Sequence, residues 1–181
     1  MTRIYIAGSA VVILVFFGVF MMSRFSGDAL PRGPAEKIIM EFPAGETREA
    51  FITDGVRHTV PLGDIVSGGP PRDGIPSIDA PQFVSPAEAD EWLASDEPGI
   101  AVSLGDTHRF YPYQILVWHE IVNDTVDGTR ILVTYCPLCF SGIVFDPVVS
   151  GERVEFGTSG KLWNSNLVMY DRKTNSLRSQ V

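Results

Sequence analysis

Short apolar runs alternate with turn-forming residues along most of the chain after about residue 47, and this pattern predicts strands rather than long helices. The runs are rich in β-branched and aromatic residues, which favour strands. Three pairs of runs flank a two-residue turn that contains glycine, and each pair predicts a hairpin: residues 50–53 with 56–60, 100–104 with 107–111, and 121–126 with 130–135. Further strands are predicted at 142–149, 153–156 and 167–170. We therefore expect an α+β fold, predominantly antiparallel β, in which hairpins form a barrel- or sandwich-like domain.

One or two short helices accompany the strands. Residues 85–88, Ser-Pro-Ala-Glu, have the spacing of a capping box, with proline at the first helical position. We expect this helix to run through Trp92 and Leu93 and to end before Pro98, with Trp92 as a core anchor. Residues 113–118 are a second candidate, a short helical turn that periodicity does not settle.

The longest apolar run lies at the N-terminus. Residues 4–22 carry no charged side chain and are numerous enough, as a helix, to cross the hydrocarbon core of a bilayer. A cleaved signal peptide is the alternative, but the residues that follow offer no Ala-x-Ala pattern. We expect a transmembrane anchor at 4–22, a juxtamembrane linker at 23–47 and a β-rich domain at 48–181.

These expectations describe a single-pass membrane protein that contacts the lipid bilayer through residues 4–22 and carries its main domain on the periplasmic or extracellular side. Charge does not settle the orientation, because Arg3 precedes the apolar run and Arg24, Arg32 and Lys37 follow it. The net charge of −8 excludes nucleic acid as a partner, because phosphates require a basic face. A homo-oligomer and a small-molecule ligand of unknown identity remain open.

The two cysteines of the chain, Cys136 and Cys139, stand three positions apart between the apolar runs 131–135 and 143–145. These runs predict that the pair lies where one strand turns into the next. Pro137 suits the second position of such a turn, whose ends come within about 7 Å of each other. Thioredoxin-like pairs instead open a helix, whose positive end lowers the thiol pKa, and no helix is predicted after Cys139.

A thiolate metal site is the leading interpretation of this pair. Cys136 and Cys139 would supply two soft ligands, whereas a tetrahedral zinc site normally has four protein ligands. No second cysteine pair exists, so we expect His119 as a third ligand, with zinc or copper as the metal. Copper(I) accepts fewer and softer ligands, and Met169 is a further candidate for it. A hydrogen-bonded structural role is the alternative for His119.

Thiol–disulfide chemistry is the rival interpretation. It would require a lowered thiol pKa at Cys136 or Cys139, which His119 or Arg172 could provide from nearby. A structural disulfide is the third interpretation, although closing so short a loop constrains the unfolded chain little.

Polar residues are also dense among the apolar strands of the second half of the chain, and they suggest a pocket. His119 with Ser159 or Glu120 could act as base and nucleophile, but no hydrolase spacing is present and catalytic residues stay unassigned. Such residues more often form turns and caps. His58 and His108 are expected to face solvent. The candidate pocket comprises Trp118, Glu120, Asn123, Asp124, Ser159, Trp163, Asn164, Asn166 and Asp171.

Several ordered motifs resemble a prokaryotic family, the domain of unknown function 3179 (DUF3179). The resemblance covers about residues 61–180 and rests on the segments 67–76, 111–116, 118–124, 134–139, 156–160 and 163–171. It implies a domain that is exported or anchored to a membrane, and it implies no established activity.

The chain departs from this family pattern in two ways. Phe140 stands where many relatives have a small residue, which bears on access to the thiols. Relatives also continue beyond the point that corresponds to Gln180, so the resemblance suggests a C-terminal truncation.

Overall fold

The structure is a computed structural model, which describes residues 29–41 and 45–181. The chain divides into two compact units, Met1–Leu62 and Gly63–Val181. The predicted transmembrane segment at 4–22 lies outside the described residues. Within the described ranges, no helix has both the length and the apolar character needed to span a bilayer.

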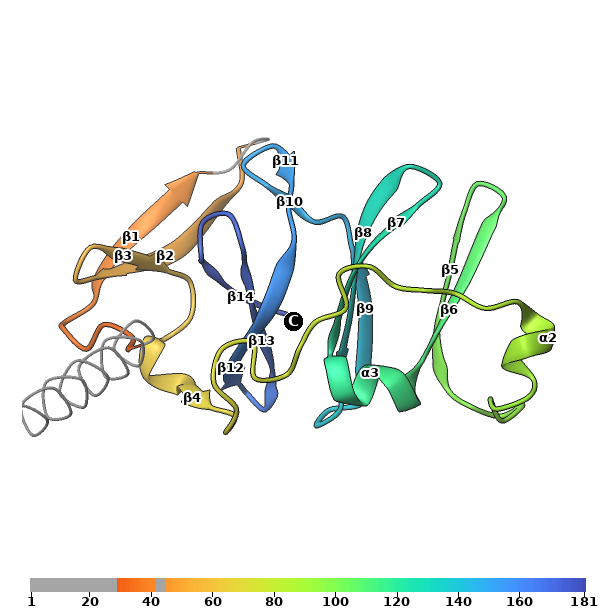
Figure 1. The fold of residues 1–181 in the computed structure, drawn as a ribbon. Coiled ribbons are helices and arrows are strands. Elements are labelled where there is room, and N and C mark those ends of the chain that lie inside the picture. The colour runs from red at the N-terminus through yellow and green to blue at the C-terminus, as the bar shows by residue number, and fades with distance from the viewer. Residues whose placement is uncertain (1–28, 42–44) are drawn as a thin grey trace, which may run out of the picture. The chain divides into compact units, whose positions relative to one another are not determined.

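The first unit contains a three-stranded antiparallel sheet in the order β1-β2-β3 (Figure 1). Its strands are β1 (Glu36–Glu41), β2 (Thr47–Thr53) and β3 (Val56–His58). Asp54 and Gly55 both have positive φ and join β2 to β3, which confirms the predicted two-residue hairpin. Strand β1 occupies part of the segment that the sequence suggested as a linker.

His58 is partly buried rather than freely exposed, so the prediction that it faces solvent is wrong in that respect. Cross-strand pairing places His58 opposite Phe51, and the two rings stack with centroids 5.5 Å apart. The Nδ1 atom lies 2.8 Å from the carbonyl oxygen of Val60, which can only accept, so Nδ1 carries the proton. The Nε2 atom then accepts from the hydroxyl of Thr53 at 2.9 Å. His108 is exposed, as predicted.

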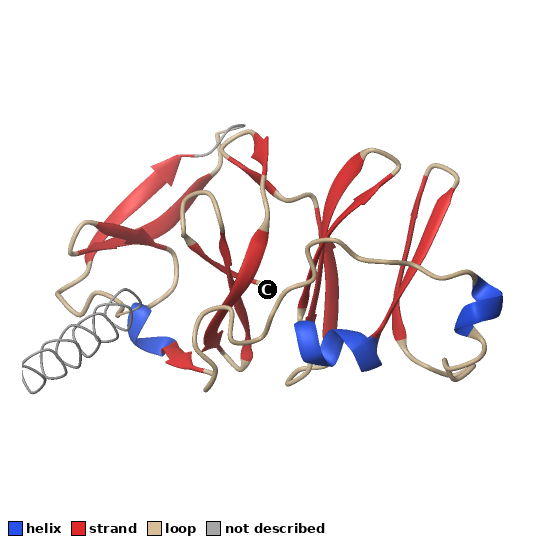
Figure 2. Ribbon diagram, in the orientation of Figure 1, coloured by secondary structure: helices blue, strands red, loops and turns tan. Residues whose placement is uncertain are grey.

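The second unit is built mainly from antiparallel strands (Figure 2). A four-stranded sheet has the order β14-β13-β12-β4, a three-stranded sheet the order β7-β8-β9, and β5-β6 and β10-β11 form two-stranded ribbons. The described residues form no closed barrel. The strands are β4 (Ile65–Ser67), β5 (Gly99–Leu104), β6 (Thr107–Pro112), β7 (Ile121–Val126), β8 (Thr129–Cys136), β9 (Ser141–Phe145), β10 (Val148–Val149), β11 (Glu152–Arg153), β12 (Phe156–Trp163), β13 (Asn166–Asp171) and β14 (Leu177–Ser179).

The hairpins β5–β6 and β7–β8 confirm the other two predicted pairs. The predicted strand 142–149 is instead divided at Asp146-Pro147 into β9 and β10, because proline cannot donate to a ladder. The predicted strand 153–156 is wrong, since β11 ends at Arg153 and β12 begins at Phe156. Asn164 and Ser165, both with positive φ, form the two-residue turn between β12 and β13.

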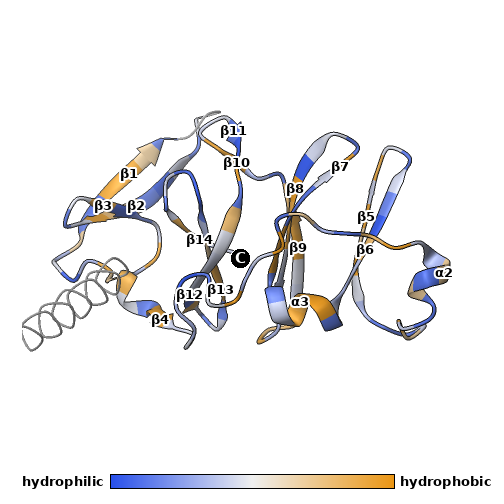
Figure 3. Ribbon diagram, in the orientation of Figure 1, coloured by the Kyte–Doolittle hydropathy of each residue, from blue (hydrophilic) through white to orange (hydrophobic). Residues whose placement is uncertain are grey.

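The hairpin β7–β8 is buried on both faces and separates two hydrophobic clusters. Figure 3 colours the strands by hydropathy, with apolar residues in orange. Alternate residues of the pleat point to opposite sides. Val122, Val133 and Tyr135 contribute to the cluster shared with β5, β6 and the helix α3 (Tyr113–His119). Ile121 and Leu132 contribute to the cluster shared with β12 and β13. This hairpin therefore holds together the β-sheets of the second unit.

The helix that begins after Ser85 is shorter than predicted. The capping box is present, with Ser85 and Glu88 bonding each other's backbone amides, but α2 covers only Pro86–Ala89. No residue of α2 is buried, and short helices depend on tertiary packing for stability. Trp92 is 50% exposed, so its predicted role as a core anchor is wrong. Helix α3 confirms the second predicted helical turn.

A bulge in β12 brings the backbone close to a preceding loop. The pairing of β12 with β13 shifts register between Thr158 and Lys161. Gly160 lies in this bulge with a φ of +70°, and a Cβ there would stand 2.1 Å from the carbonyl oxygen of Pro70. The amide of Gly68 donates to the Gly160 carbonyl at 2.8 Å. Glycine is therefore required both by the dihedral angle and by the approach of the loop.

We expect Gly160→Ala to lower the free energy of unfolding by roughly 3 kcal/mol or more, measured by equilibrium urea denaturation of the full chain. The positive φ costs about 1 kcal/mol, and the clash with Pro70 adds the remainder. Gly128→Ala is the matched control, because Gly128 has a φ of +74° with open space around it. It should lose only about 1 kcal/mol. Equal losses in the two variants would contradict the close approach at Gly160.

Candidate functional site

The two cysteines lie at the turn between β8 and β9, as the sequence predicts. Cys136 is the last residue of β8 and pairs with Ser141, the first residue of β9. The four intervening residues form the loop, and Phe140, the last of them, has a φ of +51°. Both thiols are free. A hairpin loop therefore replaces the helix start on which thioredoxin-like pairs are built.

Cys136 is buried in the cluster between β8 and the β12–β13 hairpin, with 1% of its surface exposed. Its sulfur lies 3.8 Å from the carbonyl oxygen of Ser165, and the amides of Cys139 and Leu167 donate to it. Burial nevertheless raises the pKa of the Cys136 thiol, because the anion loses more solvation than these donors restore. Cys136 therefore holds its proton more tightly than an ordinary cysteine.

Cys139 is exposed and is surrounded by hydrogen-bonding groups. Its sulfur lies 3.0 Å from the hydroxyl of Ser141 and 3.0 Å from Nδ2 of Asn166. The thiol of Cys136 also hydrogen-bonds to it. Although partial burial alone would raise it, the hydrogen bonds from Ser141, Cys136 and Asn166 lower the pKa of the Cys139 thiol. The predicted sources of this effect, His119 and Arg172, do not supply it.

Arg172 is engaged at another place in the second unit. Its guanidinium bonds Asp79 at 2.7 Å, Glu155 at 3.1 Å and Ser77 at 2.7 Å. These bonds connect the residue that follows β13 to the loop before α2 and to the residue that precedes β12, so Arg172 has a structural role.

The direction of the hydrogen bonds around Cys139 is fixed by Gln180. Nε2 of Gln180 donates to Oγ1 of Thr134 at 3.0 Å, and that hydroxyl donates to a main-chain carbonyl. Oε1 of Gln180 must then accept, and it lies 2.9 Å from both Nδ2 of Asn166 and the hydroxyl of Ser141. The two shortest contacts of the Asn166 amide therefore lead to Cys139 and to Gln180. The side chains of Gln180 and Asn166 are almost fully buried, which holds this arrangement in place.

The Ser141 hydroxyl is able to donate a hydrogen bond to the Cys139 sulfur because Asn166 already donates one to the Gln180 oxygen. Its single hydroxyl proton can point either to Gln180 or to Cys139. A thiolate attracts this proton more strongly than a neutral amide oxygen does, since hydrogen bonds to charged acceptors are stronger. The hydroxyl therefore turns toward Cys139 when the thiol ionises.

Apolar side chains surround the exposed thiol. Leu138 is 66% exposed and Phe140 is 65% exposed. The Phe140 ring packs edge-on against Tyr113 at 5.2 Å and Tyr135 at 6.1 Å, and those two tyrosine rings stack on each other at 4.2 Å. These aromatic contacts hold Phe140 in its positive-φ conformation, which is uncommon for a large side chain.

The metal-ligand set expected from the sequence is not assembled. Nδ1 of His119 bonds the carbonyl oxygen of Pro76 at 2.7 Å, so His119 fastens the end of α3 to the preceding loop. Among residues 29–41 and 45–181, no three side chains of His, Cys, Asp or Glu come close enough to hold a metal ion. The structural alternative for His119 is the one that its hydrogen bond supports.

The nine residues of the candidate pocket are dispersed over the second unit. Only Asn166 belongs to the thiol network. Asn123 is buried and bonds Asp79 and the backbone of Phe156, which ties β7 to β12. Ser159 is buried and its hydroxyl donates to the carbonyl of Val168. Buried Asp171 accepts from the amide and hydroxyl of Thr174 and so closes the turn after β13.

The remaining members are surface or turn residues, apart from Asp124. Trp118 is 73% exposed on α3, Asn164 is exposed in the β12–β13 turn, and Trp163 is half-buried at the end of β12. Asp124 is buried, where it pairs with Arg109 and accepts from the hydroxyl of Tyr111 at 2.6 Å. In the cavity between the hairpin β5–β6 and α2, none of the nine residues belongs to the lining, so the grouping of these nine residues into one pocket stays a prediction.

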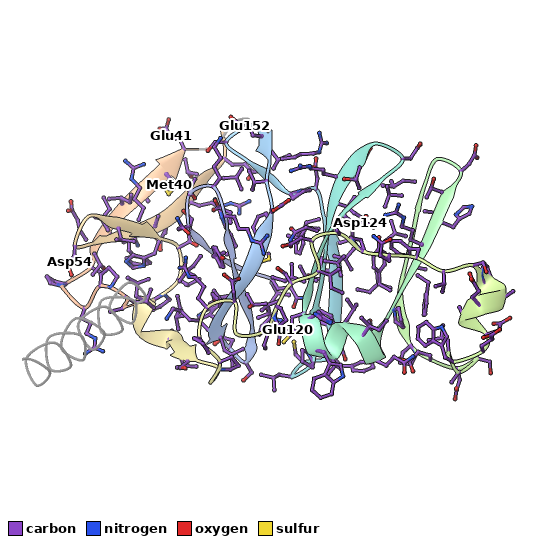
Figure 4. All side chains as sticks on the ribbon, in the orientation of Figure 1. Met40, Glu41, Asp54, Glu120, Asp124 and Glu152 are labelled. Carbon is purple, nitrogen blue, oxygen red and sulfur yellow. The ribbon has the colours of Figure 1, made fainter. Side chains whose placement is uncertain are left out.

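Glu120 has an unusual carboxyl group. It ends α3 with a φ of +57° and lies at the negative end of that helix (Figure 4). Desolvation by burial raises the pKa of Glu120 from 4.5 to about 7. The protonation of this group therefore changes near neutral pH.

Sequence reasoning missed Ser141, Thr134 and Gln180. The hairpin register gives a signal for Ser141, because a four-residue loop pairs Cys136 with the fifth residue after it. Thr134 is a polar residue in an otherwise apolar run, which is a weak signal of a buried hydrogen bond. Gln180 lies 41 positions after Cys139, and nothing local to it indicates a contact with the thiol turn.

Comparisons with known proteins give one match. A family model described as "Protein of unknown function (DUF3179)" matches residues 72–181, which is more than half of the chain. No curated protein and no solved structure matches the chain. The family match includes the thiol turn and every residue of the network around it.

We expect iodoacetamide to alkylate Cys139 in the folded protein at neutral pH while Cys136 stays unmodified, measured by peptide mass spectrometry. In Asn166→Ala, the loss of one donor should raise the pH midpoint of Cys139 alkylation by roughly half to one unit. Asn164→Gly is the control, because it changes an exposed turn residue that does not bond the sulfur. An unchanged midpoint in Asn166→Ala would show that Asn166 does not stabilise the thiolate.

We expect stability to fall as pH rises through the pKa of Glu120. The folded value of about 7 lies above the ordinary 4.5, so the unfolded state releases the proton first and is favoured increasingly between about pH 5 and pH 8. Glu120→Gln should remove this dependence and gain roughly 1–2 kcal/mol at pH 8, after allowance for partial exposure. Urea unfolding at a series of pH values measures it, with Glu91→Gln, at an exposed position, as the control. Identical pH profiles for wild type and Glu120→Gln would refute this assignment.

Proposed function

We propose, for a chain that belongs to the DUF3179 family, that Cys136 and Cys139 carry out thiol–disulfide exchange, with Cys139 as the attacking thiolate and Cys136 as the resolving thiol. The observation that carries this proposal is that the two thiols differ in exposure and in the direction of their pKa shifts. One is exposed and has a lowered pKa, and its neighbour is buried and has a raised pKa. The attacking group in thiol–disulfide exchange is a thiolate, so Cys139 is the side chain suited to begin the reaction.

The hydrogen-bond network supports the first step. The Cys139 thiolate attacks one sulfur of a substrate disulfide, a new S–S bond forms, and the substrate S–S bond breaks. The departing substrate sulfur leaves as a thiolate and takes a proton from solvent. Cys139 is exposed at the hairpin loop, which allows the approach of a disulfide. The product is a mixed disulfide between Cys139 and the remaining half of the substrate.

The contact between the two thiols supports the second step. Cys136 loses its proton, and its sulfur attacks the sulfur of Cys139. The internal Cys136–Cys139 disulfide forms, and the second half of the substrate leaves as a thiol. Two electrons have then passed from the cysteine pair to the substrate disulfide. The hydrogen bond between the thiols indicates that the sulfur atoms lie within reach of each other.

The apolar surroundings of Cys139 suit thiol–disulfide exchange with a polypeptide better than they suit hydrolysis. Leu138 and Phe140 flank the thiol with exposed apolar surface. Such a surface suits a disulfide in a polypeptide, whose neighbouring side chains can pack against it. No base is needed beside the sulfur, because the donors from Ser141 and Asn166 already favour the thiolate.

We also propose where the cysteine pair lies relative to the membrane. The apolar, uncharged run at residues 4–22 supports a membrane anchor, with the cysteine pair on the periplasmic or extracellular side. In such an oxidising compartment an exposed thiol of lowered pKa cycles between dithiol and disulfide, and the pair needs a disulfide or dithiol partner to turn over.

A model disulfide, 5,5′-dithiobis(2-nitrobenzoate), separates the two steps. Wild type should release two equivalents of thionitrobenzoate per chain and retain none, because Cys136 expels the second half. Cys136→Ser should release one equivalent and retain the other as a stable mixed disulfide on Cys139. Cys139→Ser should react far more slowly, because Cys136 is buried. Absorbance and intact mass measure these results.

Two outcomes would overturn the proposal. Retention of thionitrobenzoate by wild type would show that Cys136 does not resolve the mixed disulfide. Stoichiometric zinc or copper in purified wild type, lost in both serine variants, would favour a thiolate metal site completed by ligands from outside the described residues.

A further inference from the structure

The second unit contains a cavity of about 700 Å³ that has no part in the thiol chemistry. It lies between the hairpin β5–β6, the helix α2 with the loop before it, and the start of α3. No residue of the thiol network lines it. Its volume falls in the range of about 300–1,000 Å³ that is typical of small-molecule sites.

Most of the cavity wall is apolar. Tyr111, Leu116 and Val122, from the hydrophobic cluster of α3 and the hairpins, form its inner wall. Five of the large apolar side chains that the described part of the chain leaves exposed line its outer part: Phe83, Val84, Trp92, Phe110 and Ile115. Exposed apolar residues that gather at one concave site indicate a surface that something else covers.

Arg109 gives this apolar cavity a positive group. Its guanidinium carbon lies 4.4 Å from the centroid of the Phe83 ring, so both side chains belong to the same wall. The ion pair with Asp124 fixes the guanidinium, and the hydroxyl of Tyr111 and the amide of Thr125 hold Asp124 in turn. Asp124 accepts a hydrogen bond from Nη1 of Arg109. The guanidinium group has five N–H donors in all, so four remain besides this one.

The other polar groups at the cavity are few. His108 bonds the hydroxyl of Ser103 at 2.9 Å through Nδ1 on the outer face of the hairpin. Asp90, at the end of α2, is the acidic residue among the lining groups, and it is exposed. Arg109 is thus the only partly buried charge in the wall, with 23% of its side chain exposed. A partly buried cation beside apolar walls suits a ligand with an acidic head and an apolar body.

We propose that this cavity binds a small apolar organic acid, with its acidic group at Arg109 and its apolar body between Phe83, Trp92 and Ile115. The hairpin β5–β6 and α2 enclose the ligand, and the pair with Asp124 keeps the guanidinium in place before the ligand arrives. Such preorganisation lowers the entropy lost on binding. The site is separate from the cysteine pair and does not depend on its chemistry.

Isothermal titration of the full chain with decanoate, decanol and decyltrimethylammonium tests the proposal, because the three probes share one apolar chain. Decanoate should bind most tightly, decanol about tenfold more weakly, and the cation not at all, since a charge-assisted hydrogen bond contributes roughly 1.4 kcal/mol or more. Equal binding of the three probes, or no binding of decanoate, would overturn the proposal.

Variants then place the ligand in the cavity. Ala101→Trp fills the cavity from an exposed position on β5, and it should abolish decanoate binding without unfolding the chain. Because Arg109→Gln alone would leave Asp124 buried and unpaired, the double variant Arg109→Gln with Asp124→Asn is used. It should weaken decanoate about tenfold and leave decanol unchanged. Phe140→Ser, which changes the apolar surface beside the thiol, is the control and should bind decanoate as wild type does. Loss of decanoate binding in Phe140→Ser, with binding retained in Ala101→Trp, would contradict the site.

Discussion

The burial of both faces of the β7–β8 hairpin is the constraint on which the second unit depends. A strand pair that is covered on one side tolerates errors on the other, whereas this pair must place every side chain correctly. Val122 and Val133 enter one cluster, and Ile121 and Leu132 enter the other. A slip of one residue would exchange the two sets. It would also turn Cys136 away from the cluster that buries it, so the register of the hairpin determines the chemistry of the thiol.

The difference between the two cysteines follows from this geometry. Cys136 still belongs to the buried strand, and Cys139 lies in the loop, so residues three positions apart occupy environments of different polarity. In helix-borne pairs the partial positive charge at the helix start stabilises one thiolate. Here individual donors from three different strands take that part: Cys136 of β8, Ser141 of β9 and Asn166 of β13. The stabilisation therefore depends on tertiary packing, and it exists only when the two sheets are correctly joined.

Local features of the structure could be predicted from the sequence, and distant contacts could not. The Asp54-Gly55 and Asp127-Gly128 turns predict their hairpins correctly because these residue types suit positive φ. The capping box at Ser85 correctly predicts the start of a helix. The predicted length of that helix is wrong. The spacing of Trp92 in the sequence suggests burial, but its surroundings in the fold decide whether the side chain is buried. The cysteine turn was predicted, since runs of strand residues flank it.

The partners of the thiols illustrate the limit of such reasoning. The sequence marks Asn166 only as one polar residue among many and gives no sign of Gln180 as a partner of the thiol, although the two together orient the hydrogen bonds around Cys139. The chemistry of His119 and its nearness in sequence suggest a metal ligand, yet its ring bonds the carbonyl oxygen of Pro76. Which side chains meet across β8, β13 and the end of the chain is determined by the pairing of strands, and a single sequence does not record that pairing.

The hydroxyl of Ser141 can respond to the charge of Cys139 by moving only its hydrogen atom. It stands between the sulfur of Cys139 and the oxygen of Gln180, at nearly equal distances from the two. No heavy atom needs to move when the sulfur gains or loses its charge, because rotation about one C–O bond is sufficient. The direction of one O–H bond thus depends on the ionisation state of the thiol. Vibrational spectroscopy or neutron diffraction can detect that direction, whereas the positions of the carbon, nitrogen and oxygen atoms do not change with it.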